Sequence, residues 1–307
     1  MSQLEGRRIL VTGPGGQVGF PVARSLADRN EVLGLARFSN PADRERLEAA
    51  GVRCLAADLA SGDLDVIPED VDYVLHFAVA KSRQGDFEED LAANAEGVGR
   101  LMARCRRARA FLHCSTTGVY EPAGRHPLRE TDPLGDNHRA MLPTYSISKI
   151  AAEAVVRFAS RQFGLKTTIA RLNVPYGDNG GWPAWHLEFM RAGHPVAVHT
   201  DGPNVYNPIH EDDIIASIPR LLEIADVPPT IVNWAGNQTA SIEEWCAYLG
   251  ELTGLEPKLA PTEQTISSVV VDTTRMNELV GPTRVHWKDG FKRMVQARHP
   301  ELLASRG

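Results

Sequence analysis

Short apolar runs alternate with mixed polar and apolar stretches along the first 175 residues of the chain. The runs Arg8–Thr12 (RILVT) and Glu31–Ala36 (EVLGLA) are apolar almost throughout, as strands buried on both faces are. The stretches between such runs are long enough for helices. The repeated order of strand, helix and strand predicts an α/β fold with a doubly wound parallel sheet.

Six strands are predicted in this region, at Arg8–Thr12, Glu31–Ala36, Val52–Ala57, Tyr73–Ala78, Ala110–Cys114 and Lys166–Leu172. Helices are predicted at Gln17–Asp28, Pro41–Ala50, Asp86–Arg107 and Thr144–Phe163. Gly51 and Gly164 directly follow two of these helices, where glycine ends a helix at little steric cost.

The pattern changes after residue 175, where glycine, proline and tryptophan gather in Pro175–Pro183 (PYGDNGGWP). The later elements expected are helices near Ala184–Ala192 and Asp212–Ala225, a short run at Val196–His199, a late strand of the main sheet at Thr230–Trp234, and a helix that ends near Thr253. The spacing Ser241-x-x-Glu244 predicts a capping box at the start of that last helix. We expect this half to contain a smaller, interrupted domain packed against the carboxyl ends of the strands.

Composition narrows the class of protein. The chain has 307 residues, of which 43% are hydrophobic and 23% charged, so it can bury a sizeable core. A net charge of −6 argues against a nucleic-acid-binding role. No apolar run approaches the roughly 18 residues of a membrane span. Four dispersed cysteines and a start without an apolar leader favour a cytoplasmic protein with reduced thiols.

A glycine-rich turn follows the first strand directly. Its sequence TGPGGQVG has the spacing Gly13-x-x-Gly16-x-x-Gly19, and the residues expected to hold a cofactor there are Thr12, Gly13, Gly16, Gln17, Val18 and Gly19. Glycines in such a turn let backbone amides approach a pyrophosphate, and the following helix adds positive partial charge. The position between strand and helix predicts a dinucleotide site, so we expect residues 1–175 to form the dinucleotide-binding domain.

The second strand ends in Ala36-Arg37, without the acidic residue that usually binds the ribose of NAD. Arg37 could instead pair with a 2′-phosphate, which favours NADP while NAD stays possible. The alternative is a solvated arginine. After the third strand, Asp58 and Leu59 are placed to contact the adenine, although Asp58 could equally cap a turn.

Three separate segments carry candidate catalytic side chains. Thr116 follows the fifth strand, Asn94 lies in the long helix before it, and Tyr145 with Lys149 opens the next long helix. The i, i+4 spacing places Tyr145 and Lys149 on one helix face. Hydride transfer at a carbon requires a proton at the substrate oxygen. A lysine ammonium would lower the pKa of a phenol near 10, and the Thr116 hydroxyl would hold the oxygen.

This combination resembles the extended short-chain dehydrogenase/reductase superfamily, the group that contains nucleotide-sugar epimerases and dehydratases. The resemblance covers almost the whole chain. It rests on the glycine turn, on Asp58-Leu59 and on the pair Tyr145-x-x-x-Lys149. The other segments that carry it are His76–Ala80, Asn94-x-x-Gly97, Ser115–Tyr120, Arg171–Gly177, His210–Ile214 and Val271–Arg275.

The resemblance implies a Rossmann domain with a smaller C-terminal substrate domain. We expect 176–207 and 254–307 to form the substrate domain, and the strand and helix near 208–253 to return to the first. Thr116, Tyr145, Lys149 and Asn94 match catalytic positions. The residues that would line the cofactor, with Lys149, are Phe77, Ala78, Val79, Leu172, Asn173 and Val174. The resemblance also implies a homodimer through the two long helices.

Three departures from the nucleotide-sugar members point toward a plain carbonyl reductase. Tyr206 stands where many of those members carry a diphosphate-binding arginine. Thr117 and Gly118 stand where the dehydratases carry Asp-Glu, and Arg37 fits poorly with enzymes that retain NAD.

Several residues are expected to line the substrate pocket because of their position in the sequence. The candidates are Thr117, Trp182, His186, Tyr206 and Asn207, with Ala80–Gln84 and Trp185 nearby. The tryptophans could instead be structural, and His186 could be a satisfied internal histidine. No cluster has metal-ligand spacing, so no metal is expected.

The sequence leaves three functions open. The first is an NAD(P)-dependent oxidoreductase that interconverts a carbonyl and an alcohol on a small molecule, with Tyr145 moving the proton. The second is a nucleotide-sugar epimerase with tightly held NAD. The third is a non-catalytic sensor of NAD(P), against which the presence of both Tyr145 and Lys149 argues.

Overall fold

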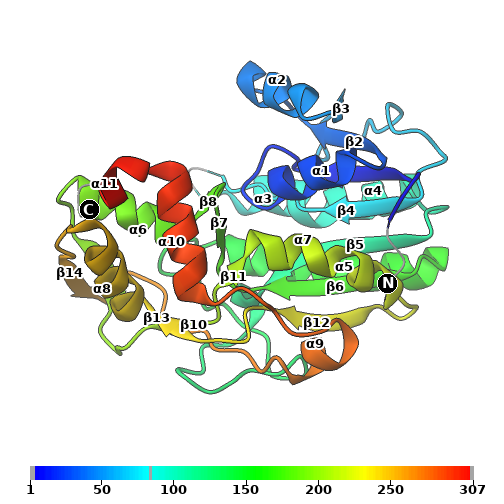
Figure 1. Cartoon of the computed structure of the whole chain (residues 1–307). Helices are drawn as coiled ribbons and strands as arrows, with labels where there is room; N and C mark the ends of the chain where they lie inside the picture. The colour runs from blue at the N-terminus through cyan, green and yellow to red at the C-terminus, as the bar shows by residue number, and fades with distance from the viewer. Residues whose placement is uncertain (1–3, 83–84, 305–307) are drawn as a thin grey trace.

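A seven-stranded parallel sheet forms the centre of the computed structural model, which describes residues 4–82 and 85–304. Its strands, in spatial order, are β12 (Thr230–Trp234), β6 (Thr167–Leu172), β5 (Ala110–Thr116), β4 (Tyr73–His76), β1 (Arg8–Thr12), β2 (Glu31–Ala36) and β3 (Arg53–Ala56). The chain winds outward from β1 in one direction and then crosses to β4 to build the other half. The predicted doubly wound α/β fold is therefore confirmed (Figure 1).

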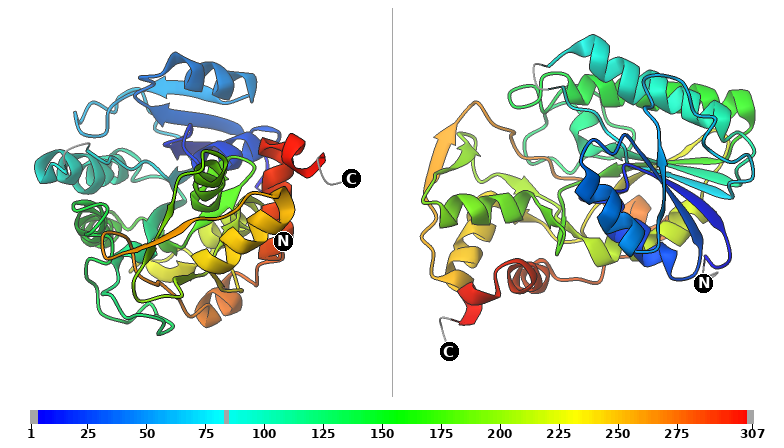
Figure 2. Two further views of the ribbon diagram at one scale, coloured as in Figure 1. Left: turned by 90° about the vertical axis from the view of Figure 1, so that its left-hand side faces the viewer. Right: turned by 90° about the horizontal axis from the view of Figure 1, so that it is seen from above.

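Helices cover both faces of the sheet because successive strand residues point in opposite directions. Ile9 and Val11 face α1 (Gly19–Ala27) and α7 (Glu211–Glu223), with α2 (Pro41–Ala49) on the same side. Leu10 faces the opposite layer, built from α4 (Gly97–Arg104) and α5 (Tyr145–Phe163). The view from above in Figure 2 shows the two helical layers on either side of the strands.

A second lobe lies beyond the carboxyl ends of the strands, on the left of Figure 1. Its helices are α6 (Trp182–Arg191), α8 (Ile242–Thr253), α10 (Trp287–Arg298) and α11 (Pro300–Ala304). Its short strands are β7 (Pro175–Gly177), β8 (Gly180–Gly181), β9 (Val196–His199), β10 (Val205–Tyr206), β11 (Ile209–His210), β13 (Ala240–Ser241) and β14 (Leu259–Thr262). Trp245 and Phe291 are fully buried in its core. Ser241 and Glu244 form the predicted capping box at the start of α8.

The packing of the later elements differs in part from the expected division of the chain. β12 and α7 join the main sheet, as the sequence predicts. However, α8 packs against α6 and α10 in the second lobe, although it lies within 208–253. Conversely, α9 (Thr274–Leu279) returns to the main sheet, where Met276 is buried beside β12. The exact domain boundaries stay a prediction.

The long helix predicted at Asp86–Arg107 is broken into three parts. An α-helical turn, α3 (Phe87–Leu91), leads into a π-helical turn, η1 (Ala92–Glu96), which continues as α4. The π turn contains Asn94. Such turns are rare and frequently mark functional sites.

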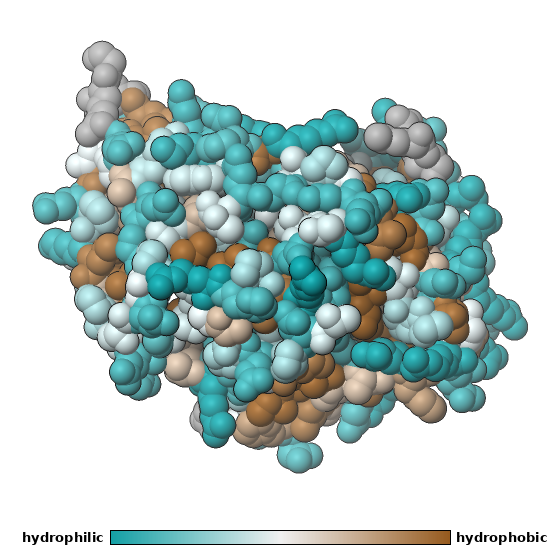
Figure 3. Space-filling view, turned by 90° about the horizontal axis from the view of Figure 1, so that it is seen from below, coloured by the Kyte–Doolittle hydropathy of each residue, from teal (hydrophilic) through white to brown (hydrophobic). Residues whose placement is uncertain are grey.

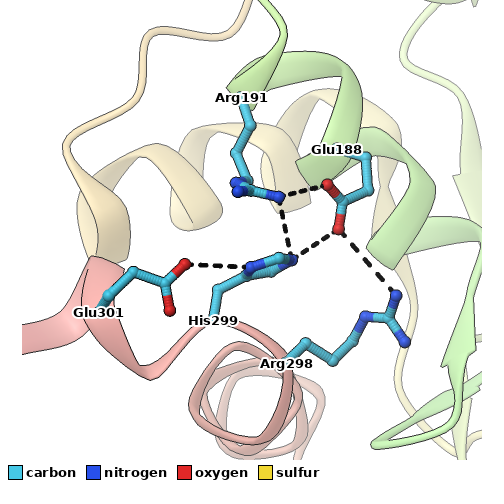
Figure 4. Close-up of polar contacts among 5 residues, drawn as sticks. All are labelled: Glu188, Arg191, Arg298, His299 and Glu301. Atoms are coloured by element: carbon cyan, nitrogen blue, oxygen red, sulfur yellow. Dashed lines mark hydrogen bonds and ion pairs between the residues drawn. The ribbon is translucent and has the colours of Figure 1, made fainter.

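A cluster of charged side chains holds the C-terminal segment against α6 (Figure 4). The imidazole of His299 lies between two carboxylates, with Nε2 2.6 Å from Glu188 and Nδ1 3.2 Å from Glu301. Arg191 donates to the other oxygen of Glu188 at 2.6 Å, and Arg298 lies 4.0 Å from the first.

The surface is mainly polar on the face seen from below, where hydrophobic side chains form separate patches (Figure 3). Within residues 4–82 and 85–304, no helix combines the length and the apolar character needed to span a bilayer.

Candidate active site

The glycine turn after β1 lies at the point where the sheet reverses its winding. Gly13 has φ of +64°, and a Cβ there would lie 2.8 Å from the backbone N and Cα of Ala78. A Cβ on Gly19 would collide with the carbonyl oxygen of Gly13. Both positions therefore need glycine, because the strand, the turn and the start of α1 pack against each other through their backbones.

Two neighbours of these glycines serve the fold directly. Thr12 is fully buried, and its hydroxyl lies 2.7 Å from Nδ1 of His76 and accepts a hydrogen bond from Ala78 N at 3.2 Å. Gln17 donates from Nε2 to the carbonyl oxygen of Pro175 at 2.6 Å. These contacts join the turn to β4 and to the first segment of the second lobe. Val18 immediately precedes α1.

A cleft of about 190 Å³ opens beside the turn. Its lining includes seven of the predicted cofactor and catalytic residues: Gly13, Arg37, Asp58, Leu59, Ala78, Val79 and Asn94. Arg37 is exposed at the end of β2 and has no hydrogen bond or ion pair with any residue that the structure describes. Asp58 lines the cleft and accepts from Ala60 N at 3.0 Å, so it caps the turn, while its contact with an adenine stays a prediction.

These features fit a dinucleotide cofactor. The glycines put no side chains at the N-terminal end of α1, whose N-cap residue Val18 makes no side-chain cap hydrogen bond, and a helix N-terminus of this kind suits a pyrophosphate. The cleft between the ends of β2, β3 and β4 would hold an adenosine, with Arg37 at its rim. Of the further residues expected along the cofactor, Phe77 is half-buried after β4, Leu172 ends β6, and Asn173 donates to Val269 O at 2.9 Å. Val174 packs against the core of the second lobe.

The predicted catalytic pair lies at the same edge of the sheet. β5 ends at Thr116 and α5 begins at Tyr145, and the Thr116 hydroxyl is close enough to the phenol to lower its pKa. The Thr116 hydroxyl also accepts from Gly118 N at 3.0 Å, which fixes its rotamer. Burial raises the pKa of the Tyr145 phenol to about 12, and Thr116 offsets only part of that rise. The phenol is therefore protonated at neutral pH.

Lys149 lies one turn further along α5, fully within the fold. Its Nζ donates to the carbonyl oxygen of Cys114 at 2.7 Å, and burial lowers its pKa. The sequence led us to expect that this ammonium would lower the pKa of Tyr145. The structure corrects that expectation, because burial of the phenol has the larger effect and the ammonium is directed at a carbonyl.

Asn94 acts on the backbone rather than at the reacting atoms. Its Oδ1 accepts from Ala80 N at 2.7 Å, while Nδ2 donates to Ala80 O at 2.9 Å and to Ser148 Oγ at 3.1 Å. These three hydrogen bonds fix the segment after β4 against α5. The catalytic role expected of Asn94 stays a prediction.

Four predicted substrate residues are part of the second lobe's internal structure or adjoin it. His186 accepts from Trp245 Nε1 at 2.9 Å, and burial lowers its pKa to about 4. The Tyr206 hydroxyl lies 2.9 Å from the carbonyl oxygens of both Ile266 and Ser267, which share its one donated proton. The buried side chain of Asn207 bonds to the backbone of Gly236 and Val271, and Trp182 packs edge-on against Tyr206. The Tyr206 hydroxyl and the Asn207 side chain are thus bonded within the second lobe, and contact of these four residues with a substrate stays a prediction.

Thr117 is buried beside the catalytic residues, and its carbonyl oxygen accepts from Asn137 Nδ2 at 3.0 Å. Of the predicted lining segment Ala80–Gln84, Arg83 and Gln84 lie outside the described residues. Within the described part of the chain, no three histidine, cysteine or acidic side chains come together as metal ligands.

The sequence placed Lys81 in a predicted lining segment but did not indicate His138, and the structure brings both to the reacting end. The ring of His138 lies 5.5 Å from that of Tyr145, and Lys81 Nζ lies 5.0 Å from the Tyr145 ring centroid. Lys81 falls within a segment that the sequence singled out only by position. The segment around His138 has no spacing or composition that would have distinguished it from an ordinary loop.

Known structures share this fold over nearly the whole chain. UDP-glucuronic acid 4-epimerase from Bacillus cereus superimposes with a TM-score of 0.82 at 20% identity, over 94% of this chain and 98% of that one. UDP-glucose 4-epimerase from Thermotoga maritima gives a TM-score of 0.81 at 23% identity, over 96% and 99%.

Curated relatives match at low identity. The spore coat polysaccharide biosynthesis protein SpsK of Bacillus subtilis is 24% identical over 95% of this chain and 98% of its own length. The trifunctional enzyme RHM2 of Arabidopsis thaliana, a UDP-glucose 4,6-dehydratase, 3,5-epimerase and reductase, is 25% identical over 96% of this chain. The chain spans only 48% of that relative's length.

The family assignment rests on a match to a family profile. The profile of the NAD dependent epimerase/dehydratase family matches residues 9–235, from the first strand to the end of the last strand of the main sheet. This region contains the glycine turn, Thr116, Tyr145 and Lys149. The chain is therefore an enzyme of the NAD dependent epimerase/dehydratase family, within the extended short-chain dehydrogenases/reductases that its motifs resemble.

Proposed function

We propose that this enzyme is an NADP-dependent reductase that converts a carbonyl group to an alcohol on a small sugar-derived substrate. The observation that carries the proposal is the pairing of the Thr116 hydroxyl at the end of β5 with the buried phenol of Tyr145 at the start of α5, at the edge of the sheet that also carries the glycine turn. An acid paired with a second hydroxyl is suited to a carbonyl oxygen that gains negative charge.

The chain's own residues would handle the proton. The nicotinamide, when bound, supplies the hydride that reaches the carbonyl carbon. Thr116 holds the carbonyl oxygen, and Tyr145 gives that oxygen its proton. Burial raises the pKa of this phenol, so it carries the proton that a reduction requires. Lys149, whose Nζ donates to the carbonyl oxygen of Cys114, holds α5 against the end of β5 beside this pair.

The preference for NADP rests on Arg37. Its guanidinium is exposed at the rim of the adenosine cleft and has no partner among the described residues. A planar, permanently charged group there would form paired hydrogen bonds with a 2′-phosphate. β2 also ends without an acidic residue, which is the type of residue that usually binds the ribose 2′-hydroxyl of NAD.

A sugar-derived substrate is supported by the relatives. The dTDP-4-dehydrorhamnose reductase of Burkholderia thailandensis is 33% identical over 48% of this chain, and the 2′-dehydrokanamycin reductase of Streptomyces kanamyceticus is 29% identical over 70%. Both names describe the reduction of a ketone on a sugar ring. Tyr206, with its hydroxyl bonded inside the second lobe, offers no cation for a diphosphate, so the substrate need not carry a nucleotide.

An epimerase with retained NAD is the second candidate. It is favoured by the UDP-glucose 4-epimerase of Azospirillum brasilense, which is 31% identical over 62% of this chain.

The predicted homodimer through α4 and α5 and the cytoplasmic location remain proposals. The exposure of Phe158 (65%) and Ile147 (38%) on α5 supports the dimer.

The test is a spectrophotometric screen. Purified enzyme with NADPH is mixed with dTDP-4-dehydrorhamnose, with 2′-dehydrokanamycin and with simple ketones, and loss of NADPH absorbance is followed. Stoichiometric NADPH oxidation by at least one keto sugar supports the proposal. Conversion of UDP-glucose to its 4-epimer without net oxidation of any cofactor would contradict it.

A further inference from the structure

The segment 121–144 between β5 and α5 brings an imidazole to the catalytic tyrosine. The ring of His138 packs against that of Tyr145 at 5.5 Å between centroids, with the planes 38° apart. Lys81, from the segment after β4, places its ammonium 5.0 Å from the same phenol ring. Groups from two distant parts of the chain thus meet at Tyr145, which is expected at a reacting centre rather than in a simple loop contact.

Gly118 provides the space that the imidazole occupies. A Cβ at position 118 would lie 2.9 Å from both Cε1 and Nδ1 of His138 and 3.2 Å from the Thr116 hydroxyl. His138 therefore lies beside Thr116 as well as Tyr145. Any larger residue at 118 would displace the imidazole from this position.

Asn137 determines which nitrogen of His138 carries the proton. Asn137 Nδ2 donates to the Thr117 carbonyl at 3.0 Å, so its Oδ1 faces the ring and accepts from Nδ1 of His138. Nε2 is then left with its lone pair free. Burial, together with the charge of Lys81, lowers the pKa of His138 to about 4, so the ring is neutral at pH 7.

Nε2 of His138 is also reachable by a ligand. It makes no hydrogen bond with any residue in the described part of the chain. Both ring nitrogens of the deeply placed His113 are buried and unpartnered, but Nε2 of His138 is not among such enclosed atoms. An acceptor nitrogen without a partner is therefore available on a ring that packs against Tyr145.

We propose that His138 is a substrate-binding residue of this site, and that its Nε2 accepts a hydrogen bond from a substrate hydroxyl next to the reacting carbonyl. This inference rests on the proposed reductase function. The hydroxyls of Thr116 and Tyr145 donate to the carbonyl oxygen, whereas His138 can only accept. One acceptor beside two donors selects an α-hydroxy ketone, as found in a keto sugar, over a ketone without a neighbouring hydroxyl.

The first test needs no substrate. Diethyl pyrocarbonate, which acylates neutral and accessible imidazoles, is applied at neutral pH, and modified histidines are located by peptide mass. We expect label on His138 and on His126, whose side chain is 66% exposed, but not on His113. Label on His126 with none on His138 would overturn the proposal.

The second test compares His138→Phe with His138→Gln. Phenylalanine keeps a ring against Tyr145 but has no acceptor, whereas glutamine retains an amide oxygen. With dTDP-4-dehydrorhamnose we expect His138→Phe to lower kcat/KM by about 10- to 100-fold, the cost of an unpaired hydroxyl. His138→Gln should recover part of this loss. The 3-deoxy analogue should react equally with wild type and His138→Phe.

His126→Phe serves as the matched control, and NADPH affinity should be the same in every variant. An unchanged kcat/KM for the hydroxylated probe in His138→Phe would overturn the role of His138 while leaving the reductase function intact. If no keto sugar oxidises NADPH, the proposed function fails and the substrate contact fails with it. The labelling result would still show separately whether Nε2 is accessible.

Discussion

Gly13 lies so close to Ala78 that a methyl group on it would stand 2.8 Å from two backbone atoms of Ala78. This approach brings the end of β1 against the segment that follows β4, at the place where the winding of the sheet reverses. Ligands of open α/β sheets bind at that position. The cofactor cleft therefore exists because two backbones can touch there without an intervening side chain.

Gly13→Ala should destabilise the protein strongly. The residue has φ of +64° and its new Cβ would press on the backbone of Ala78, so we expect a loss of about 2–4 kcal/mol in the free energy of unfolding. Gly15→Ala is the control, because its Cβ would meet only the Asp43 side chain at 3.5 Å. Urea unfolding measures both. Equal stability of the two variants would show that the contact does not constrain the turn.

Tyr145→Phe should remove turnover and keep the cofactor site. Loss of the proton donor is expected to lower kcat by about 10²- to 10⁴-fold, while NADPH affinity stays within a factor of two or so. Tyr248→Phe is a suitable control, because Tyr248 packs on Trp287 in the second lobe. Steady-state rates and a fluorescence titration provide the two readouts. Full activity of Tyr145→Phe would remove Tyr145 from the mechanism.

Arg37→Ala should discriminate between the two cofactors. Loss of charge-assisted hydrogen bonds to a 2′-phosphate is expected to weaken NADPH binding by about 1.5–3 kcal/mol and leave NADH binding unchanged. Arg44→Ala is the matched control, because Arg44 is paired with Glu48 at 2.8 Å. Calorimetric titration of each variant with both cofactors measures the effect. If the affinities for NADPH and NADH fell equally, Arg37 would not bind the 2′-phosphate.

The charged cluster on α6 predicts a loss of stability in acid. Burial alone would raise the pKa of Glu188, but hydrogen bonds from His299 and Arg191 outweigh it and hold the pKa below 4.5. A carboxyl whose pKa is lower in the folded state stabilises the fold above its ordinary pKa, and the effect fades as pH falls through the folded value. Glu188→Gln should therefore have a lower Tm than wild type at neutral pH.

That difference in Tm should shrink as the pH falls below 4.5, and thermal melts from about pH 7 to about pH 3 would follow it. Arg161→Gln, on an exposed part of α5, provides a control for a general change of charge. A gap that stays constant down to the lowest pH would show that the Glu188 carboxylate does not support the C-terminal segment.

The sequence predicts the buried strands well because their signal is local. The bounds of β1, β2 and β12 agree with the apolar runs in which they were predicted. The capping box at Ser241 is equally local, since its two partners are three residues apart. The π turn that contains Asn94 has no such signal, because its helix looks continuous in composition.

Roles that depend on distant partners could not be predicted. The sequence predicts that Tyr206 and His186 line the substrate pocket. In the structure, their hydrogen bonds to Ile266 and Trp245 place them inside the second lobe. The accessibility of His138 depends on Gly118, twenty positions earlier, and on the orientation of Asn137. Such relationships appear only when the folded chain brings the segments together.

The most direct test of the account is to identify the nucleotide that the enzyme carries. The purified protein is denatured, any released nucleotide is identified by chromatography, and fresh protein is titrated with NADPH and NADH. We expect little retained nucleotide and tighter binding of NADPH, as an exchanging reductase with Arg37 at the 2′-phosphate requires. Stoichiometric release of NAD would contradict the account, because a cofactor recycled in place belongs to an epimerase rather than to a net reductase.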